Sequence, residues 1–162
     1  MKSYNILFLC TGNSARSILA EALVTTLSGG KFIGYSAGSN PAGLVNPFAS
    51  ELVIEMGYPK EKLRSKNWDE YSLPGSPQMD FIITVCDNAA NEVCPIWLGH
   101  PSTAHWGFPD PASVEGTDAI KREAFQKTLL GLTKNIEALI HLPIDQLDLL
   151  SLKKAIQDIH DE

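Results

Sequence analysis

The N-terminal part of this chain contains a short apolar run, a loop of small residues that begins with a cysteine, and a helical pattern. Residues 5–9 are typical of a fully buried strand. The loop Cys10–Ser17 follows at once, and apolar side chains then recur at helical spacing from Ile18 to Leu27. A strand that leads through such a loop into a helix favours a fold in which the loop lies at the end of a sheet.

This loop predicts an anion-binding pocket around a reactive sulfur. The N–H groups of the loop and of the helix N-terminus converge on a negative ligand, and the helix dipole favours its charge. Arg16 can add two charge-assisted hydrogen bonds to a tetrahedral oxyanion. The same field is expected to lower the pKa of Cys10, so that its thiolate attacks the bound anion. The alternative is a buried structural cysteine beside a surface arginine.

Strand and helix patterns alternate along the rest of the chain. Further strand patterns cover residues 31–36, 80–85 and 103–106, and further helical patterns cover residues 46–56, 118–139 and 149–159. This alternation predicts an α/β fold, with a four-stranded parallel sheet, right-handed crossovers and helices on both faces. Because Pro143 interrupts the helical pattern, we expect a domain over residues 1–142 and an extra C-terminal helix, residues 143–162, packed on that same domain.

Three chemically useful side chains follow three of the predicted strands. Cys10 follows the first strand, Cys86 the third and Asp110 the fourth. Because ligands bind at the carboxyl ends of parallel strands, we expect these groups at one edge of the sheet. The prolines on either side of Asp110 restrict its backbone and suit it to donate a proton to a leaving oxygen. The alternative for Asp110 is an ordinary Asx turn, while His105 and Trp106 are expected to be structural.

Cys86 and Cys94 suggest a redox-driven conformational change. If the segment between them were helical, their Cα atoms would lie about 12 Å apart. A disulfide needs roughly 7 Å or less, so the segment would have to unwind. Simple packing is one alternative. Zinc bound with His100 and His105 is another, although paired ligands of structural zinc sites usually stand about two to four residues apart.

Composition limits the class of protein. The chain has 162 residues, 44% of them apolar and 20% charged, as in an ordinary single globular domain. Its net charge of −6 argues against nucleic acid binding. No apolar run approaches the ~20 residues of a membrane span. Because the first predicted strand begins near residue 5, we expect no signal peptide. Three cysteines favour a cytoplasmic protein with reduced thiols.

The residues that carry these signals resemble thioredoxin-coupled arsenate reductases, which share their fold with low-molecular-weight protein tyrosine phosphatases. The resemblance spans about residues 4–140, which corresponds to the predicted domain 1–142. The matching segments are Cys10–Ser17, Tyr35–Gly38, Cys86, Cys94–Pro95, His105–Gly107 and Asp110–Ala112.

The resemblance implies a relay of three thiols. Cys10 attacks arsenate while Asp110 protonates the departing oxygen, and Cys86 then attacks the Cys10 sulfur and releases arsenite. Cys94 next attacks Cys86, which leaves a disulfide that thioredoxin, or glutaredoxin with glutathione, can reduce. Ser17 supports the Cys10 thiolate. The oxyanion is held by the rest of the loop: Thr11, Gly12, Asn13, Ser14, Ala15 and Arg16.

The resemblance also implies that no cofactor is required, although some relatives bind a potassium ion near the loop. The matching residues here are Asn13, Glu21, Ser36 and Asp69. Asn13 would in addition steady the loop. We expect a monomer.

A tyrosine phosphatase that works through a cysteinyl-phosphate is the main alternative function, because phosphate and arsenate have the same shape. Hydrolysis needs one thiol and an acid, whereas arsenate reduction needs two electrons, which further thiols can supply. Cys86 and Cys94 therefore favour reduction. Ala112 also replaces the aromatic residue that the phosphatases carry after their acidic residue. A binding protein that senses oxyanions or redox state is the third possibility.

Overall fold

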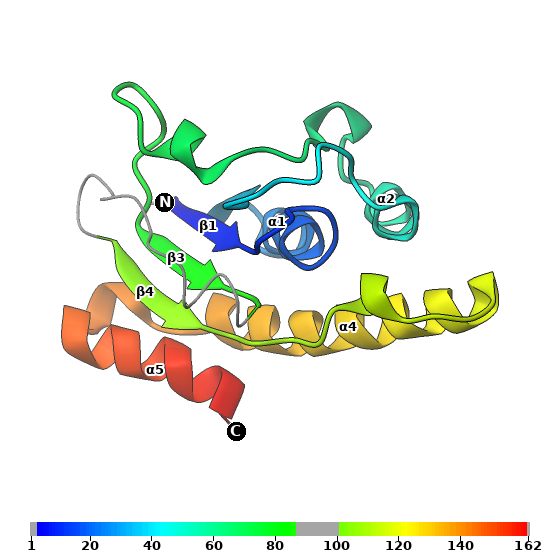
Figure 1. The fold of residues 1–162 in the computed structure, drawn as a ribbon. Helices are drawn as coiled ribbons and strands as arrows, with labels where there is room; N and C mark the ends of the chain where they lie inside the picture. The colour runs from blue at the N-terminus through cyan, green and yellow to red at the C-terminus, as the bar shows by residue number, and fades with distance from the viewer. Residues whose placement is uncertain (1–2, 87–100, 162) are drawn as a thin grey trace.

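A four-stranded parallel sheet forms the centre of the protein (Figure 1). The structure is a computed structural model and describes residues 3–86 and 101–161. The strands are β1 (Tyr4–Leu9), β2 (Phe32–Ala37), β3 (Phe81–Thr84) and β4 (Ser102–His105), in the order β2-β1-β3-β4. Each pair is parallel, which confirms the predicted α/β class.

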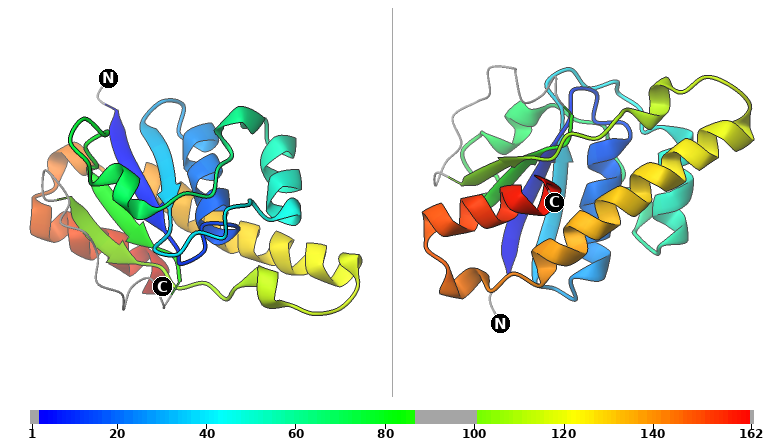
Figure 2. Two further views of the ribbon diagram at one scale, coloured as in Figure 1. Left: turned by 45° about the horizontal axis from the view of Figure 1, so that its top comes forward. Right: turned by 90° about the horizontal axis from the view of Figure 1, so that it is seen from below.

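The register of the sheet aligns the carboxyl ends of its strands. Leu9 pairs with Ala37 on one side and with Thr84 on the other, and Thr84 pairs in turn with His105. The loops that follow β1, β3 and β4 therefore leave the sheet at one edge, as the views in Figure 2 show. This edge is where the sequence predicts the functional groups.

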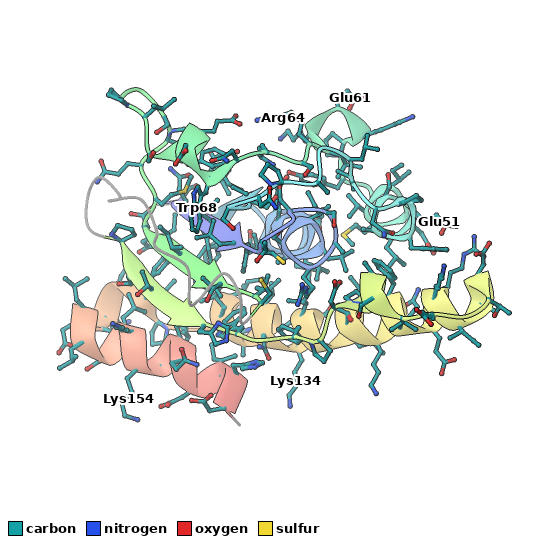
Figure 3. All side chains as sticks on the ribbon, viewed as in Figure 1. Glu51, Glu61, Arg64, Trp68, Lys134 and Lys154 are labelled. Atoms are coloured by element: carbon teal, nitrogen blue, oxygen red, sulfur yellow. The ribbon has the colours of Figure 1, made fainter. Side chains whose placement is uncertain are left out.

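One face of the sheet is covered by three helices, α1 (Arg16–Leu27), α4 (Asp118–Ile140) and α5 (Leu149–Asp161). Buried residues of these helices form a single core with alternate residues of the strands, among them Ile6, Phe8, Phe81 and Ile83. The charged residues Lys134 of α4 and Lys154 of α5 point away from this core (Figure 3). The helices therefore have the apolar inner face that their periodicity predicts.

The other face of the sheet has a smaller core. Leu7, Leu9 and Ile82 pack there against Trp68 and Met79. Trp68 begins the 3₁₀ helix Trp68–Tyr71. Among the described residues, this is the helix that packs on this face of the sheet. Figure 3 shows Trp68 beside the sheet.

Helix α2 (Pro47–Glu55) lies against α1 and α4. Its start agrees with the sequence, because the Asn46 side chain accepts a hydrogen bond of 2.9 Å from the Phe48 amide and Pro47 occupies the first helical position. Two further 3₁₀ turns lie in the loops. Lys60–Lys62 follows α2, and Pro111–Ser113 follows β4.

The C-terminal helix supports the β4 edge of the sheet at His105. The Gln157 side chain accepts a hydrogen bond from the His105 amide (2.8 Å) and donates one to the His105 carbonyl (2.7 Å), as the backbone of a neighbouring strand would. Trp106 donates its indole N–H to the Ile156 carbonyl (3.0 Å). Before α5, a 3₁₀ turn over Ile144–Gln146 places Asp145 where it accepts a hydrogen bond from Tyr4. The boundary at residue 142 stays a prediction.

Within residues 3–86 and 101–161, no helix is both long enough and apolar enough to cross a bilayer.

Candidate active site

The carbonyl oxygens of the loop after β1 accept hydrogen bonds from a neighbouring segment. Backbone amides of the segment 40–46 donate to these oxygens: Asn40 to Thr11 (3.0 Å), Ala42 to Gly12 (2.9 Å) and Asn46 to Ser14 (2.9 Å). In a trans peptide the N–H points opposite to the carbonyl oxygen. The amides of the loop are therefore turned inward, where they can bind an anion at the N-terminus of α1.

Gly38 allows the next segment to approach this loop. A Cβ atom at position 38 would lie 2.4 Å from the Thr11 carbonyl oxygen and 2.6 Å from that of Cys10. Both contacts are far too short for a side chain, so only glycine fits here. The Gly38 amide donates to the Lys66 carbonyl (2.9 Å), which joins the loop to a third segment.

Asn13 stabilises the loop from within through its side-chain hydrogen bonds, as the family resemblance implies. It is completely buried and has a φ of 45°, a conformation that asparagine tolerates better than most residues. Its amide nitrogen donates to the Ser17 hydroxyl (2.8 Å), and its amide oxygen accepts from the Lys66 backbone N–H (2.9 Å). Ser17, also fully buried, is thereby fixed at the start of α1.

The thiols of Cys10 and Cys86 meet at the bottom of the site. Both are buried, and the Thr11 amide donates to the Cys86 sulfur (3.3 Å). The hydrogen bond with Cys86 and burial raise the pKa of Cys10, while Arg16 and the Gly12 amide lower it. The raising effects are larger, so the expectation of a lowered pKa is wrong. The sequence places the two cysteines on one edge but does not reveal that they touch.

Contact between the thiols makes them titrate as a pair. Two neighbouring thiolates repel each other, so the protons of the pair leave in two separate steps. Loss of the first proton raises the pKa of the thiol that keeps the second. The pair is thus suited to hold one nucleophilic sulfur beside one that can form a disulfide with it.

Arg16 reaches across the site to the loop after β4. It donates from Nη1 to the Phe108 carbonyl (2.8 Å), and its Nη2 lies 3.8 Å from Oδ2 of Asp110. Its Nε is buried and has no hydrogen-bond partner within the described ranges. A buried donor without a partner is costly, and a bound oxyanion would satisfy it.

Asp110 forms the Asx turn considered for it and also faces Arg16, while its role as a proton donor stays a prediction. Oδ1 accepts a hydrogen bond from the Ala112 amide (3.0 Å), which is the Asx turn that starts the 3₁₀ turn Pro111–Ser113. The turn leaves Oδ2 directed to Arg16. Nearby, Trp106 is fully buried and the His105 ring is hydrogen-bonded to the Thr84 hydroxyl (2.7 Å), consistent with structural roles.

Two expectations involve residues outside the described ranges. Cys94 and His100 lie within residues 87–100, so the final thiol of the relay and the zinc alternative stay predictions. Within residues 3–86 and 101–161, no three His, Cys, Asp or Glu side chains gather closely enough to hold a metal ion.

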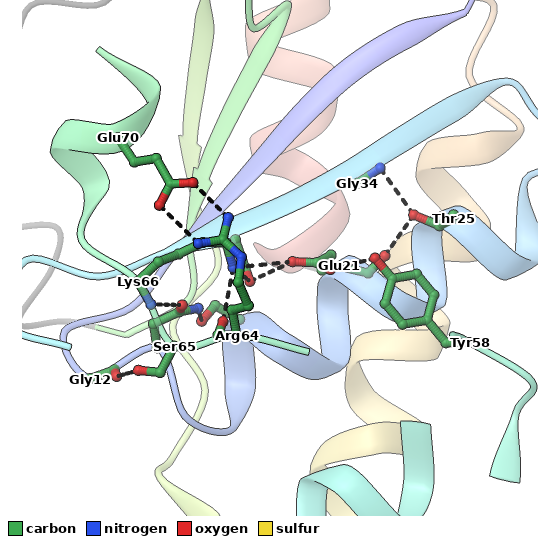
Figure 4. A network of polar contacts seen from close by, with 12 residues as sticks. Gly12, Glu21, Thr25, Gly34, Tyr58, Arg64, Ser65, Lys66 and Glu70 are labelled. Carbon is green, nitrogen blue, oxygen red and sulfur yellow. Dashed lines mark hydrogen bonds and ion pairs between the residues drawn. The ribbon is translucent and has the colours of Figure 1, made fainter. Parts of the chain in front are cut away.

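The expected potassium ligands are brought together only in part. Ser36 donates to Oε1 of Glu21 (2.7 Å), and Asn13 is linked to the same region through Lys66. The Lys66 Nζ lies 3.7 Å from Oε1 of Glu21 and 3.5 Å from the Ser36 hydroxyl (Figure 4). Asp69 is exposed, and within the described ranges no hydrogen bond or ion pair joins its carboxylate to this cluster. Glu21 and Ser36 therefore contact an ammonium at the place expected for potassium, and the potassium site itself stays a prediction.

The sequence of the chain is similar to that of a known protein family. Residues 5–154 match the family described as low molecular weight phosphotyrosine protein phosphatase. The chain belongs to this family. An arsenate reductase from Halalkalibacterium halodurans is 38% identical to this family member over 132 residues, which make up 82% of the chain and 91% of the relative.

Solved structures show the same fold. The arsenate reductase from Archaeoglobus fulgidus aligns with a TM-score of 0.65 and 24% identity, over 85% of this chain and 99% of that one. A thioredoxin-dependent arsenate reductase from Corynebacterium glutamicum aligns with a TM-score of 0.54 and 26% identity, over 83% of this chain and 62% of that one. The four-stranded, phosphatase-like fold predicted from the sequence is confirmed.

Proposed function

We propose that this protein reduces arsenate to arsenite with electrons from its own thiols. The observation that carries the proposal is the contact between Cys10 and Cys86 near Arg16, whose Nε has no hydrogen-bond partner among the residues that the structure describes. A hydrolase of this family needs one thiol, whereas a two-electron reduction needs a second thiol within reach of the first. The arsenate reductases among its relatives support the same conclusion.

In the first step, arsenate binds to the inward-facing amides from Gly12 to Ser17, and Arg16 donates to its oxygens. The Cys10 thiolate attacks arsenic and forms an S–As bond. The As–O bond opposite breaks, and Asp110 gives its proton to the departing oxygen, which leaves as water. Arsenic remains As(V) in this step.

In the second step, the Cys86 thiolate attacks the sulfur of Cys10. An S–S bond forms, the S–As bond breaks, and its electron pair stays on arsenic, which leaves as As(III) in arsenite. The two sulfurs have together lost two electrons. The contact between the Cys10 and Cys86 sulfurs supports this step, because neither residue has to move far before the attack.

In the third step, Cys94 attacks Cys86, frees Cys10 and carries the disulfide to the 86–94 pair. A dithiol protein of the thioredoxin class then reduces this disulfide by exchange and supplies the two electrons of the cycle. The thioredoxin-dependent relative from Corynebacterium glutamicum supports this choice of reductant. Glutaredoxin with glutathione is the other reductant to be tested.

Hydrolysis of phosphotyrosine is the second candidate, because the family carries that name. A largely apolar cavity of about 380 Å³ lies beside Asp110 and is lined in part by Phe108, Val114 and Thr128. No residue of the Cys10–Ser17 loop lines it, so it does not offer a place for an aromatic ring directly over the Cys10 sulfur. This favours a small oxyanion as the substrate.

The test is a coupled assay of the purified protein with thioredoxin, thioredoxin reductase and NADPH. Arsenate should drive NADPH oxidation over many turnovers, and phosphate should not. Cys10→Ser, Cys86→Ser and Cys94→Ser should each abolish turnover. Rapid hydrolysis of an aryl phosphate without arsenate-dependent oxidation would instead identify a phosphatase. Stoichiometric oxidation without turnover would identify a sensor.

A further inference from the structure

A buried acidic residue next to the active-site loop needs a positive partner. Glu21 of α1 is 4% exposed. Its Oε1 accepts a hydrogen bond from Ser36 (2.7 Å), and its Oε2 accepts one from Tyr58. Hydroxyl groups solvate a carboxylate but do not neutralise it, and an uncompensated buried charge is strongly unfavourable.

Lys66 supplies that charge. It is 6% exposed, and its ammonium donates to the Arg64 carbonyl (2.9 Å) and to the Ser36 hydroxyl (3.5 Å). The same ammonium forms an ion pair with Oε1 of Glu21 at 3.7 Å (Figure 4). Burial lowers the pKa of Lys66, and the attraction of Glu21 opposes this shift, as in a buried ion pair.

The same residue also touches the active-site loop. Its backbone N–H donates to Oδ1 of Asn13, and Asn13 in turn holds Ser17. Three of the four residues expected to bind potassium, namely Asn13, Glu21 and Ser36, therefore contact Lys66 or lie beside it. A potassium ion at this place would meet a second positive charge within a few ångströms.

We propose that the Lys66 ammonium is a built-in cation that takes the place of a monovalent metal ion beside Glu21 and positions the Cys10 loop through Asn13. Lys66 is a positioning residue in this scheme and does not contact the substrate. The proposal does not depend on whether the loop reduces arsenate or hydrolyses a phosphate ester.

The surroundings of the ion pair make the proposal testable with added cations. Glu21 and Lys66 line a cavity of about 330 Å³ together with Tyr35, Tyr58 and Tyr71. The cavity is open to solvent, so a small ion can reach Glu21 if the ammonium is removed. Lys62 lines the same cavity but makes no hydrogen bond or ion pair with Glu21 within the described ranges, and so offers a matched control.

The experiment compares the wild-type protein, Lys66→Met and Lys62→Met in KCl, NaCl and choline chloride at equal ionic strength. Thermal unfolding and the alkylation rate of Cys10 are measured for each. The wild type and Lys62→Met should give the same values in all three salts. Lys66→Met should unfold about 10 °C lower in choline chloride. Potassium should restore at least half of this loss, and of any loss in Cys10 alkylation rate, with a saturable concentration dependence.

A double variant separates loss of charge balance from simple misfolding. Glu21→Gln combined with Lys66→Met leaves no buried charge, so it should be more stable than Lys66→Met and should not respond to potassium. Three results would overturn the proposal: a wild type that potassium stabilises over choline, a Lys66→Met variant as stable as the wild type, or a destabilised Lys66→Met variant that no cation rescues while the double variant recovers. Because unfolding is measured without arsenate, the outcome is independent of the proposed activity.

Discussion

Replacing Gly38 with alanine should damage the active-site loop more than it damages the fold. The added Cβ would lie 2.4 Å from the Thr11 carbonyl oxygen, and real Cβ contacts are not shorter than 3.0 Å, so the loop must retreat by about 0.6 Å. Displacements near 1 Å at a reacting centre cost about 10²-fold in rate, so we expect kcat/KM for arsenate to fall roughly 10- to 100-fold. Overpacking costs about 1–3 kcal/mol, which lowers Tm by roughly 3–9 °C in a chain of this size.

Gly34→Ala is the matched control for this prediction. Its Cβ would lie 2.5 Å from the Glu21 carbonyl oxygen, a clash of nearly the same size, but against α1 and not against the Cys10 loop. Gly34→Ala should lower Tm by a similar amount. Its clash can reach the Cys10 loop only indirectly, through Glu21 and Lys66, so kcat/KM should fall by less than in Gly38→Ala. Equal kinetic losses in the two variants, or wild-type kinetics in Gly38→Ala, would refute the reasoning.

Three further predictions concern the thiol pair and the C-terminal helix. Cys86→Ala removes the hydrogen bond that most raises the pKa of Cys10. The pH dependence of Cys10 alkylation, followed by peptide mass spectrometry, should therefore shift to lower pH. An unchanged midpoint would contradict the contact between Cys10 and Cys86. The hydrogen bond to Asp145 raises the pKa of Tyr4 from 10.0 to about 12. The stabilisation from this bond is therefore complete below pH 10 and is lost as the pH rises through 12. Asp145→Asn should lower the pKa of Tyr4 in an ultraviolet titration, and an unaltered titration would count against this role of Asp145. Gln157→Ala removes two hydrogen bonds from the edge of β4 and should cost about 1–3 kcal/mol in urea unfolding, whereas no loss would show that α5 leaves the edge unsupported.

Much of the fold was predictable because its signals are local. The apolar run of β3 and the Asn46–Pro47 helix start depend on neighbouring residues, and the structure has both. The parallel topology then brings Cys10, Cys86 and Asp110 to one edge without further information. Local patterns and one topological rule were sufficient for these features.

The remaining features depend on contacts between distant segments. Lys66 lies in an irregular stretch, and its partner Glu21 is on α1, so nothing near either residue reveals the pair. Gln157 of α5 supports β4 through side-chain hydrogen bonds that no periodicity encodes. The direction of the Cys10 pKa shift likewise depends on a thiol that is brought into contact only by folding.

The most direct test of the proposed relay is a single turnover of the Cys94→Ser variant. Without its last thiol, the protein should stop after the second step. We expect one equivalent of arsenite and one disulfide between Cys10 and Cys86, identified by peptide mass spectrometry, and no disulfide when phosphate replaces arsenate. Arsenite release without the Cys10–Cys86 disulfide, or repeated turnover with thioredoxin, would contradict the relay.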